Sequence, residues 1–419
     1  MPDLYFIQKE NTMKNVSPTP PKGWNSWDSY GASVTEEEVM ANAHVLSETY
    51  LKYGWEYCVV DIQWSEPTAE SNEYHDYAEL EMDEFSRLVP ASNRFPSGFK
   101  KLGENIHNLG LKFGIHIMRG IPRQAVHKNT KLLNSEYTVR DIAHPNSICP
   151  WNTDMYGLNP NHPASQLYYD SLLEMYASWG VDLIKVDDIA NSNLYGTHRD
   201  EIEMIQKAIK KTGRKIVLSL SPGPTNIESG AFIQKHANMW RLTDDFWDNW
   251  DQLRDMFDRC EKWAPFVKPG SWPDCDMLPM GRIGIRSAGG DRYTRFTQNE
   301  QRTMMSLWSI FGSPLMFGGD MRFNDEFTQS LLTNTRVIEM HDNAYERYES
   351  YRDEERIEWS AFCPKYEYRG IFNVCEGPID LSYDPSFEIM WSNVSVDQLE
   401  AHDCILLRRK IGVKHDKDK

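Results

Sequence analysis

The stretch GVDLIKVDDIANS, residues 180–192, starts as an apolar run and then presents Lys185, Asp187 and Asp188 in quick succession. One explanation is a buried strand that simply reaches solvent, where charged side chains mark its exit. The other is a strand of a parallel barrel, because the carboxyl ends of barrel strands carry the catalytic residues. The rest of the chain decides between these two interpretations.

Short apolar runs alternate with longer amphipathic stretches along most of the chain. Residues 36–53, 166–179 and 199–212 have the spacing of helices that pack one face against a core. The runs predicted as strands are residues 23–30, 57–64, 111–118, 181–188, 215–221, 238–244, 271–277 and 314–320. This alternation predicts an α/β fold, a (β/α)8 TIM barrel over residues 18–341, with a doubly wound sheet as the alternative.

Two segments depart from this alternation. Residues 119–165, approximately, form a long insertion between the third and fourth predicted strands, and their Pro, Asn and Gly content predicts irregular structure. We expect this insertion to be an ordered lid over the barrel mouth. Residues 342–412 alternate with period two and carry no helical pattern, which predicts a small C-terminal antiparallel β-sandwich domain. The charged end KHDKDK is expected to fray.

Composition excludes several classes of partner. The formal net charge of −17 opposes binding to nucleic acid or to an anionic membrane. The amino terminus lacks the pattern of a signal peptide and no run of 18 apolar residues occurs, so we expect a cytoplasmic location. The seven cysteines are odd in number and form no C-x-x-C pair, which predicts mostly reduced, buried thiols. A homo-oligomer is left open.

Polar residues end each predicted strand, and a barrel would gather them at one mouth. Carboxylates that are crowded together raise each other's pKa and repel, so such a mouth needs a chemical reason. Lys185 and Arg241 would neutralise part of the charge. The strand-end residues are Trp27 with Asp28, Asp61 with Trp64, His116, Lys185 with Asp187 and Asp188, Ser219 with Ser221, Arg241 with Asp244 and Asp245, Asp274 with Asp276, and Asp320.

Few chemistries suit this set. A metal site would need more histidine, yet only His116 ends a predicted strand and no H-E-x-x-H pattern occurs. A nucleotide or acyl-transfer site would need a G-x-G-x-x-G, Walker or G-x-S-x-G pattern, and none is present. Paired carboxylates between aromatic walls fit glycoside cleavage, where one acid attacks and another protonates the leaving oxygen. We therefore expect a carbohydrate substrate and no metal or organic cofactor.

Five ordered motifs sharpen this expectation. They are PPKGWNSWDSYG (20–31), VDIQW (60–64), GVDLIKVDD (180–188), WRLTDDFWDNW (240–250) and SWPDCDMLPMG (271–281). Together they resemble glycoside hydrolase family 27, the melibiase-like family of retaining α-galactosidases and α-N-acetylgalactosaminidases. The resemblance spans residues 18–340, and LEAHDCILLRR near the end resembles the close of the family's C-terminal β-sandwich. It implies a (β/α)8 barrel and a two-step mechanism with a retained anomeric configuration.

The resemblance also implies residue roles. Asp187 becomes the nucleophile, with Lys185 beside it as a donor to a sugar hydroxyl. Asp245, four residues after Arg241, becomes the general acid and base, with Asp244 as its nearest competitor. Arg119 and Arg123 in the insertion are further candidates for substrate contact. The substrate-binding candidates are Trp27, Asp61, Ile62, His116, Cys149, Lys185, Ser221, Arg241, Asp276 and Met277.

Two departures from the family pattern point to different sugars. Where the family usually has two adjacent acids, Asp61 is followed by Ile62, which would suit a sugar without the exocyclic hydroxyl, such as a β-L-arabinopyranoside. Alternatively, Ile62 turns away and Gln63 or His116 takes over the contact. Ser221 stands where α-galactosidases have a glutamate, and it resembles the N-acetylgalactosaminidase branch.

These observations lead to one main hypothesis and two alternatives. The main hypothesis is a retaining exo-α-glycosidase acting on a terminal α-galactoside or α-N-acetylgalactosaminide, both of galacto configuration. The alternatives are an enzyme of altered specificity similar to a β-L-arabinopyranosidase, and a non-catalytic carbohydrate-binding barrel.

Overall fold

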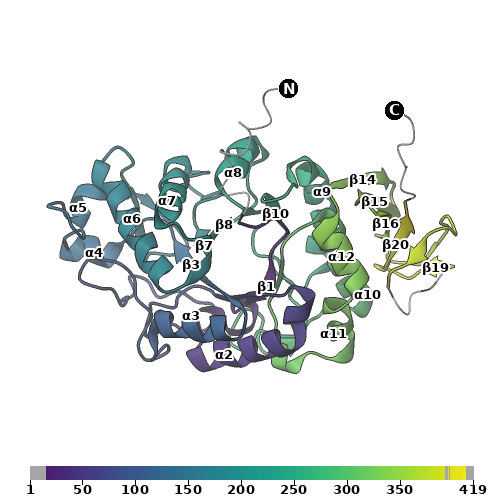
Figure 1. Ribbon diagram of the computed structural model, residues 1–419, viewed down its shortest axis with the longest axis horizontal. Coiled ribbons are helices and arrows are strands. Elements are labelled where there is room, and N and C mark those ends of the chain that lie inside the picture. The colour runs from purple at the N-terminus through teal and green to yellow at the C-terminus, as the bar shows by residue number, and fades with distance from the viewer. Residues whose placement is uncertain (1–15, 392–394, 396, 412–419) are drawn as a thin grey trace, which may run out of the picture.

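The core of the protein is a parallel barrel with helices on its outside (Figure 1). The computed structural model describes residues 16–391, 395 and 397–411. The eight barrel strands, in spatial order, are β10 (Trp272–Asp274), β9 (Met239–Arg241), β8 (Val217–Leu220), β7 (Val181–Asp187), β3 (Lys112–Met118), β2 (Tyr57–Val60), β1 (Lys22–Asn25) and β13 (Leu315–Phe317). Every neighbouring pair in this order is parallel.

The ring closes just beyond β10. Leu278 pairs in parallel with Phe317 of β13, and its amide donates a hydrogen bond of 2.7 Å to the carbonyl of Met316. The amide of Gly318 returns a bond of 3.0 Å to the carbonyl of Leu278. The predicted (β/α)8 barrel is therefore confirmed, and the carboxyl ends of its strands share one rim.

Every barrel strand except β3, which ends at Met118 as predicted, is shorter than predicted at its carboxyl end. The first predicted strand, residues 23–30, stops at Asn25, because the side-chain carbonyl of Asn25 accepts a 2.9 Å hydrogen bond from the amide of Trp27. This Asx turn starts a short helix instead. The sixth strand ends at Arg241 rather than at residue 244. Lys185, Asp187, Arg241 and Asp274 lie in the last residues of their strands, and the other charged residues of the rim lie on the loops that follow.

Helices surround the barrel, and most barrel strands are followed along the chain by at least one helix. Residues 36–53 are helical as predicted, since a π-helical turn (Leu46–Tyr50) and a 3-10 turn (Leu51–Tyr53) continue the second helix. The α-helices are α1 (Trp27–Tyr30), α2 (Glu36–Val45), α3 (Gly98–Asn108), α4 (Arg123–Lys128), α5 (Val139–Ile142), α6 (Pro163–Ser178), α7 (Arg199–Thr212), α8 (Gly230–His236), α9 (Trp250–Trp263), α10 (Gln298–Phe311), α11 (Glu326–Leu332) and α12 (Thr335–Asn343).

The insertion after β3 is more regular than predicted. It contains α4 and α5 and a small antiparallel sheet in the order β4 (Ile121–Pro122), β6 (Met155–Leu158) and β5 (Ala143–Ile148). Elements this short leave little periodicity in a sequence, and the Pro and Asn residues mark the turns between them. The insertion therefore contains regular elements where irregular structure was predicted, and its role as a lid stays a prediction.

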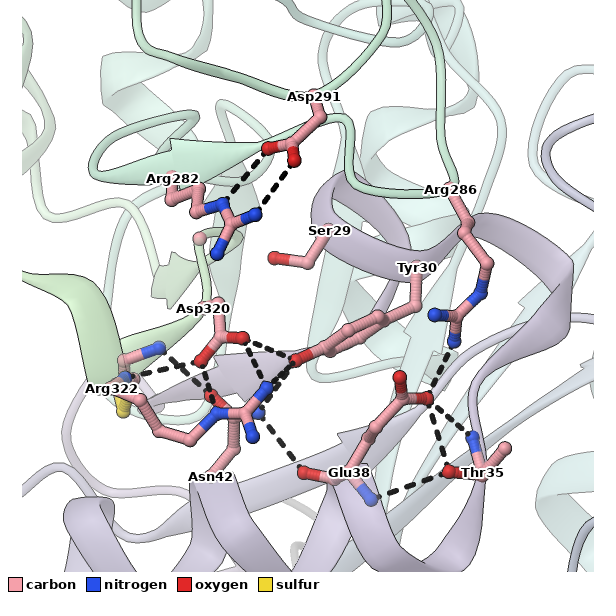
Figure 2. A network of polar contacts seen from close by, with 12 residues as sticks. Ser29, Tyr30, Thr35, Glu38, Asn42, Arg282, Arg286, Asp291, Asp320 and Arg322 are labelled. Atoms are coloured by element: carbon pink, nitrogen blue, oxygen red, sulfur yellow. Dashed lines mark hydrogen bonds and ion pairs between the residues drawn. The ribbon is translucent and has the colours of Figure 1, made fainter.

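A hairpin after β10 is fastened to the first two helices by a polar network (Figure 2). Its strands are β11 (Arg282–Ile283) and β12 (Arg292–Tyr293), and between them Arg286 lies 2.6 Å from Glu38 of α2. Nearby, the hydroxyl of Tyr30 donates to Asp320 at 2.5 Å, and Arg322 lies 2.6 Å from the same carboxylate. Burial and the neighbouring Asp320 raise the pKa of Tyr30, so its hydroxyl stays a hydrogen-bond donor.

The C-terminal part is an antiparallel β domain that packs on α10 (Figure 1). One sheet has the order β14 (Glu346–Arg352), β15 (Arg356–Phe362), β16 (Tyr366–Asn373), β20 (Cys404–Lys410) and β18 (Glu388–Ile389), and β17 (Ile379–Asp380) pairs with β19 (Gln398–Leu399). Residues 300–311 of α10 are all buried between this domain and the barrel. The end KHDKDK lies outside the described residues.

The structure also bears on the cysteines and on membrane-spanning helices. The cysteines are free thiols, and all except the partly exposed Cys375 are buried. Within the described ranges, no helix is long and apolar enough to cross a membrane.

Candidate active site

An ion pair that spans β3, between residues of β7 and the end of β2, lies at the centre of the site. Nζ of Lys185 on β7 is 2.9 Å from Oδ2 of Asp61, which follows β2, and Asn25 donates a 2.7 Å hydrogen bond to the same oxygen. Burial alone would raise the pKa of Asp61, but Lys185, His116 and the Asn25 hydrogen bond outweigh burial and hold the pKa well below its ordinary value. Asp61 is therefore a buried, ionised hydrogen-bond acceptor.

A second carboxylate, Asp187, ends β7. Nε2 of His116 on β3 lies 3.0 Å from its Oδ2, and the amide of Asp188 donates a 2.8 Å hydrogen bond to its Oδ1. Burial would raise the pKa of Asp187, but the hydrogen bond and charge of His116 and the charge of Lys185 outweigh burial and lower it. Trp64 holds His116 in place by donating to its carbonyl at 2.6 Å. Asp187 is thus kept ionised and oriented.

Arg241, at the end of β9, contacts two further carboxylates of the rim. Its Nη2 is 2.7 Å from Oδ2 of Asp276 and 3.3 Å from Oδ1 of Asp245, and it donates a 2.6 Å bond to the carbonyl of Asp244. The amide of Phe246 also donates to Asp276, at 2.8 Å. The Asp245 side chain is 53% exposed, so it faces open solvent while its neighbours are held.

Asp61, Lys185, Asp187 and Asp245 line a cavity of about 340 Å³ at the barrel mouth. Its aromatic wall begins with Trp27, whose ring is stacked on Tyr74 at 6.2 Å between centroids and 14° between planes. Trp151 from the insertion lies 5.6 Å from Tyr74. Such flat apolar faces beside carboxylates can bind a sugar ring and its hydroxyls. Of the residues singled out from the sequence, the cavity is lined by Trp27, Asp61, Ile62, Lys185, Asp187, Asp244 and Asp245.

Ile62 lies in the wall of this cavity, next to Asp61, and is 5% exposed. Gln63 is engaged elsewhere, because its Nε2 donates a 2.5 Å hydrogen bond to Asp154 of the insertion. His116 is bound to Asp187. Neither polar neighbour therefore takes the place that a second acid would have beside Asp61.

Six of the ten predicted substrate-binding residues do not line this cavity: His116, Cys149, Ser221, Arg241, Asp276 and Met277. Ser221 is 1% exposed, and its hydroxyl donates a 3.4 Å bond to the carbonyl of Val186. Its neighbour Pro222 lines the cavity in its place. Met277 lines a separate space of about 30 Å³ beneath Lys185 and Arg241. Cys149 is buried, and burial together with the nearby Asp188 raises the pKa of its thiol to about 12.

Arg119, the first arginine of the insertion, is a structural residue. It lies 2.8 Å from Asp188 and 3.2 Å from Glu201, and all three side chains are buried. Burial raises the pKa of Asp188 to about 6 even though Arg119 acts against this shift. This cluster holds the loop that follows Asp187 in place. Asp188 therefore stabilises the loop conformation and does not line the catalytic cavity.

Further buried acids surround the floor of the site. Burial, with the Asp276 carboxylate, raises the pKa of Asp274 to about 7. Burial raises the pKa of Asp28 well above its ordinary value, and the negative charges of Asp276 and Asp245 raise it further. A proton on such groups would relieve the repulsion that a fully ionised mouth would suffer. The described residues contain no group of three His, Cys, Asp or Glu side chains that could hold a metal ion.

Sequence reasoning missed several lining residues because they lie on loops. Asn72 and Tyr74 belong to the long connection after β2, Asn193 follows β7, and Trp247 and Ala288 lie beyond β9 and β10. The sequence of a loop has no hydrophobic periodicity that would mark its lining residues. Trp247 and Asn193 could have been suggested only because they lie close to the end of a strand. Asn25, the residue that orients Asp61, was readable as a strand-end polar residue but was not singled out.

Comparison with known proteins finds one family model and relatives that are all named as glycosidases. The family model described as Alpha galactosidase A (Melibiase_2) matches residues 19–131 and 152–343. The crystal structure of a GH27 β-L-arabinopyranosidase from Geobacillus stearothermophilus is 51% identical, with a TM-score of 0.91 over 96% of this chain and 99% of that chain. Alpha-galactosidase 2 of Arabidopsis thaliana is 27% identical over 79% of this chain and 69% of its own length. Alpha-N-acetylgalactosaminidase of Gallus gallus is 25% identical, over 77% and 70% respectively.

Removing the central cation should destabilise the barrel. Lys185→Met leaves the Asp61 carboxylate buried without its charge partner, and we expect the free energy of unfolding to fall by about 3 kcal/mol at neutral pH. Asp61 normally stabilises the fold above its unfolded pKa of about 3.9, and that contribution is lost as the pH falls. The difference in the free energy of unfolding between the wild type and Lys185→Met should therefore shrink as the pH falls toward 3. Urea unfolding across this pH range measures it.

The double variant Lys185→Met with Asp61→Asn is the matched control, because it removes both charges. It should recover most of the loss at neutral pH. Equal stability of Lys185→Met and the wild type at pH 7 would contradict this account of the ion pair.

Proposed function

The chain belongs to the Melibiase_2 family, glycoside hydrolase family 27, and from this premise we propose that it releases terminal β-L-arabinopyranosyl residues by a retaining mechanism. A β-L-arabinopyranoside has the ring and anomeric configuration of an α-D-galactopyranoside but lacks the exocyclic CH2OH group. The single observation that carries this choice is Ile62 in the cavity wall beside Asp61. The 51% identity to a β-L-arabinopyranosidase supports it.

The physical argument rests on the missing hydroxyl. An isoleucine side chain cannot hydrogen-bond to a sugar 6-hydroxyl, and burying such a group without a partner costs about 1–3 kcal/mol. A pentopyranose presents no group there, so Ile62 would make only apolar contact. Asp61 and Lys185 remain available for the ring hydroxyls, since both line the cavity and hold each other in place.

Asp187 is the proposed nucleophile. Its carboxylate attacks the anomeric carbon as the bond to the leaving oxygen breaks, which forms a covalent glycosyl–enzyme ester. A nucleophile must be ionised, and the neighbouring His116 and Lys185 favour that state by lowering the pKa of Asp187. Water then attacks the same carbon from the opposite face, so the two inversions restore the configuration.

Asp245 is the proposed general acid and base. It donates its proton to the leaving oxygen in the first step and removes a proton from the attacking water in the second. Its exposed position at the edge of the cavity suits a group that must meet both the leaving group and solvent. Arg241 contacts Asp245 and Asp276 together, which places it between the acid and the cavity floor.

A second candidate is hydrolysis of α-galactosides, which several curated relatives perform according to their names. The pair of Asp61 and Lys185 favours a galacto-configured ring for either substrate. An N-acetylgalactosaminide is less well supported, because Ser221 does not line the cavity. A cytoplasmic location, a homo-oligomer and the absence of nucleic-acid or membrane partners stay predictions.

A panel of 4-nitrophenyl glycosides tests this specificity. We expect kcat/KM for the β-L-arabinopyranoside to exceed that for the α-galactoside by at least about tenfold, the ratio that one unpaired hydroxyl produces. Ile62→Asp supplies the missing acceptor and should reverse or abolish this preference. Ile62→Ala is the matched control, because it adds space without an acceptor. A wild-type preference for α-galactoside or α-N-acetylgalactosaminide would contradict the proposal.

The choice between Asp245 and Asp244 follows from leaving-group dependence. Asp245→Asn should lower kcat/KM for an alkyl glycoside by about 100-fold or more, because such a leaving group needs the proton. Activated aryl glycosides should suffer much less in the first step. Asp244→Asn is the matched control, and we expect it to affect both substrate classes equally and weakly. The reverse pattern would assign the acid to Asp244.

A further inference from the structure

A second cavity, of about 570 Å³, lies outside the catalytic cavity. It is bounded by residues 77–79 after β2, by α4 and by residues 153–156 of the insertion. Its most prominent side chains are Tyr77, Arg123, Lys128 and Tyr156. Tyr77 is 68% exposed, the highest value among the large hydrophobic side chains of the described residues.

Arg123 stands over both tyrosines and, among the described residues, forms no ion pair. Its guanidinium carbon is 4.4 Å from the centroid of Tyr156 and 5.3 Å from that of Tyr77. Its Nε is buried without a hydrogen-bond partner, and its positive charge opposes the burial that raises the pKa of the nearby Asp154 to about 6. By contrast, the buried Arg119 and Arg241 each contact two acids.

Two carboxylates, Glu79 and Asp154, also line this cavity. Oε2 of Glu79 accepts a 3.1 Å hydrogen bond from Gln124, and Oδ2 of Asp154 accepts the bond from Gln63. Asp154 is buried at the inner end, next to the wall that carries Ile62. The guanidinium of Arg123 and the ammonium of the exposed Lys128 are the positive charges of the lining, and Oδ1 of the buried Asp154 has no hydrogen-bond partner.

The two cavities are neighbours. Tyr74 and Trp151 line the catalytic cavity, whereas Tyr77 and Thr153, a few residues further along the same two segments, line the second cavity. The amide of Tyr77 donates a 2.7 Å bond to the hydroxyl of Thr153, which ties the two segments together. Three residues of chain span at most about 11 Å, so one oligosaccharide can reach from one cavity to the other.

We propose that this second cavity binds a uronic acid residue of the glycan whose terminal sugar occupies the catalytic cavity. The guanidinium edge of Arg123 holds the carboxylate with two parallel hydrogen bonds, which is the geometry that arginine offers and lysine lacks. The exposed ring of Tyr77 packs against the sugar, and Lys128 adds positive charge at the rim. The glycan context rests on the proposed function, whereas uronate binding itself requires no turnover.

Calorimetric titration with D-glucuronate and D-galacturonate tests this site. D-Glucose, D-galactose and acetate are the matched probes, because they lack either the carboxylate or the ring. We expect both uronates to bind more tightly than all three. Arg123→Gln should weaken uronate binding about tenfold or more, as loss of a charged bidentate contact predicts. Arg123→Lys, which keeps the charge without the fork, should recover only part of it.

The ring of Tyr77 is tested separately. Its φ of 58° lies in the left-handed region, so Tyr77→Asn removes the ring with a residue that tolerates this backbone. We expect Tyr77→Asn to weaken uronate binding several-fold. Arg254→Gln on α9 and Tyr345→Asn before β14 remove exposed side chains of the same types elsewhere and should leave binding unchanged.

Several results would overturn the proposal. They are no uronate binding, equal binding of the neutral sugars, equal binding of acetate, and undiminished binding in Arg123→Gln. Retained binding in that variant would place the uronate in another cavity. Wild-type turnover of 4-nitrophenyl glycosides tests the proposed function separately, so failure of either proposal is recognised without reference to the other.

Discussion

The site depends on neutralising negative charge in a confined space. A parallel barrel brings the carboxyl ends of all its strands to one rim, and this chain places Asp61, Asp187 and Asp276 there. Two cations make this arrangement stable, since the partly buried Lys185 is 2.9 Å from Asp61 and the buried Arg241 is 2.7 Å from Asp276. Each cation also orients a carboxylate that would otherwise repel its neighbours. Packing on the outside of the barrel serves to hold these strands in register.

Charge distribution also separates the roles of the acids. Asp187 is held as a carboxylate because His116 and Lys185 lower its pKa, whereas burial raises that of Asp274 to about 7. Asp245 is exposed and retains access to solvent. The rim therefore places an ionised carboxylate, the proposed nucleophile Asp187, near a solvent-exposed one, the proposed acid Asp245. A retaining glycosidase needs both, because one acid must attack while another carries a proton.

The barrel was predictable because its signal is repeated along the chain: buried strands read as apolar runs, and the helix at residues 199–212 was predicted to the residue. Strand ends were less predictable, since a single hydrogen bond from Trp27 to the side chain of Asn25 ends β1. Loop residues such as Tyr74 and Trp151 reach the cavity through long connections that have no periodicity. Ile62 was recognised as a departure, but only the structure shows that it faces the cavity and that Gln63 is bound to Asp154.

The most direct test of the mechanism is to trap the intermediate. A slow, activated 2-deoxy-2-fluoro-β-L-arabinopyranoside should inactivate the enzyme by forming a glycosyl ester, and peptide mass spectrometry locates the label. The account predicts a single label on Asp187, whose reactivity is lost in Asp187→Asn. A label on another residue would contradict the assignment of the nucleophile. Turnover with inverted product and no label would contradict the retaining mechanism itself.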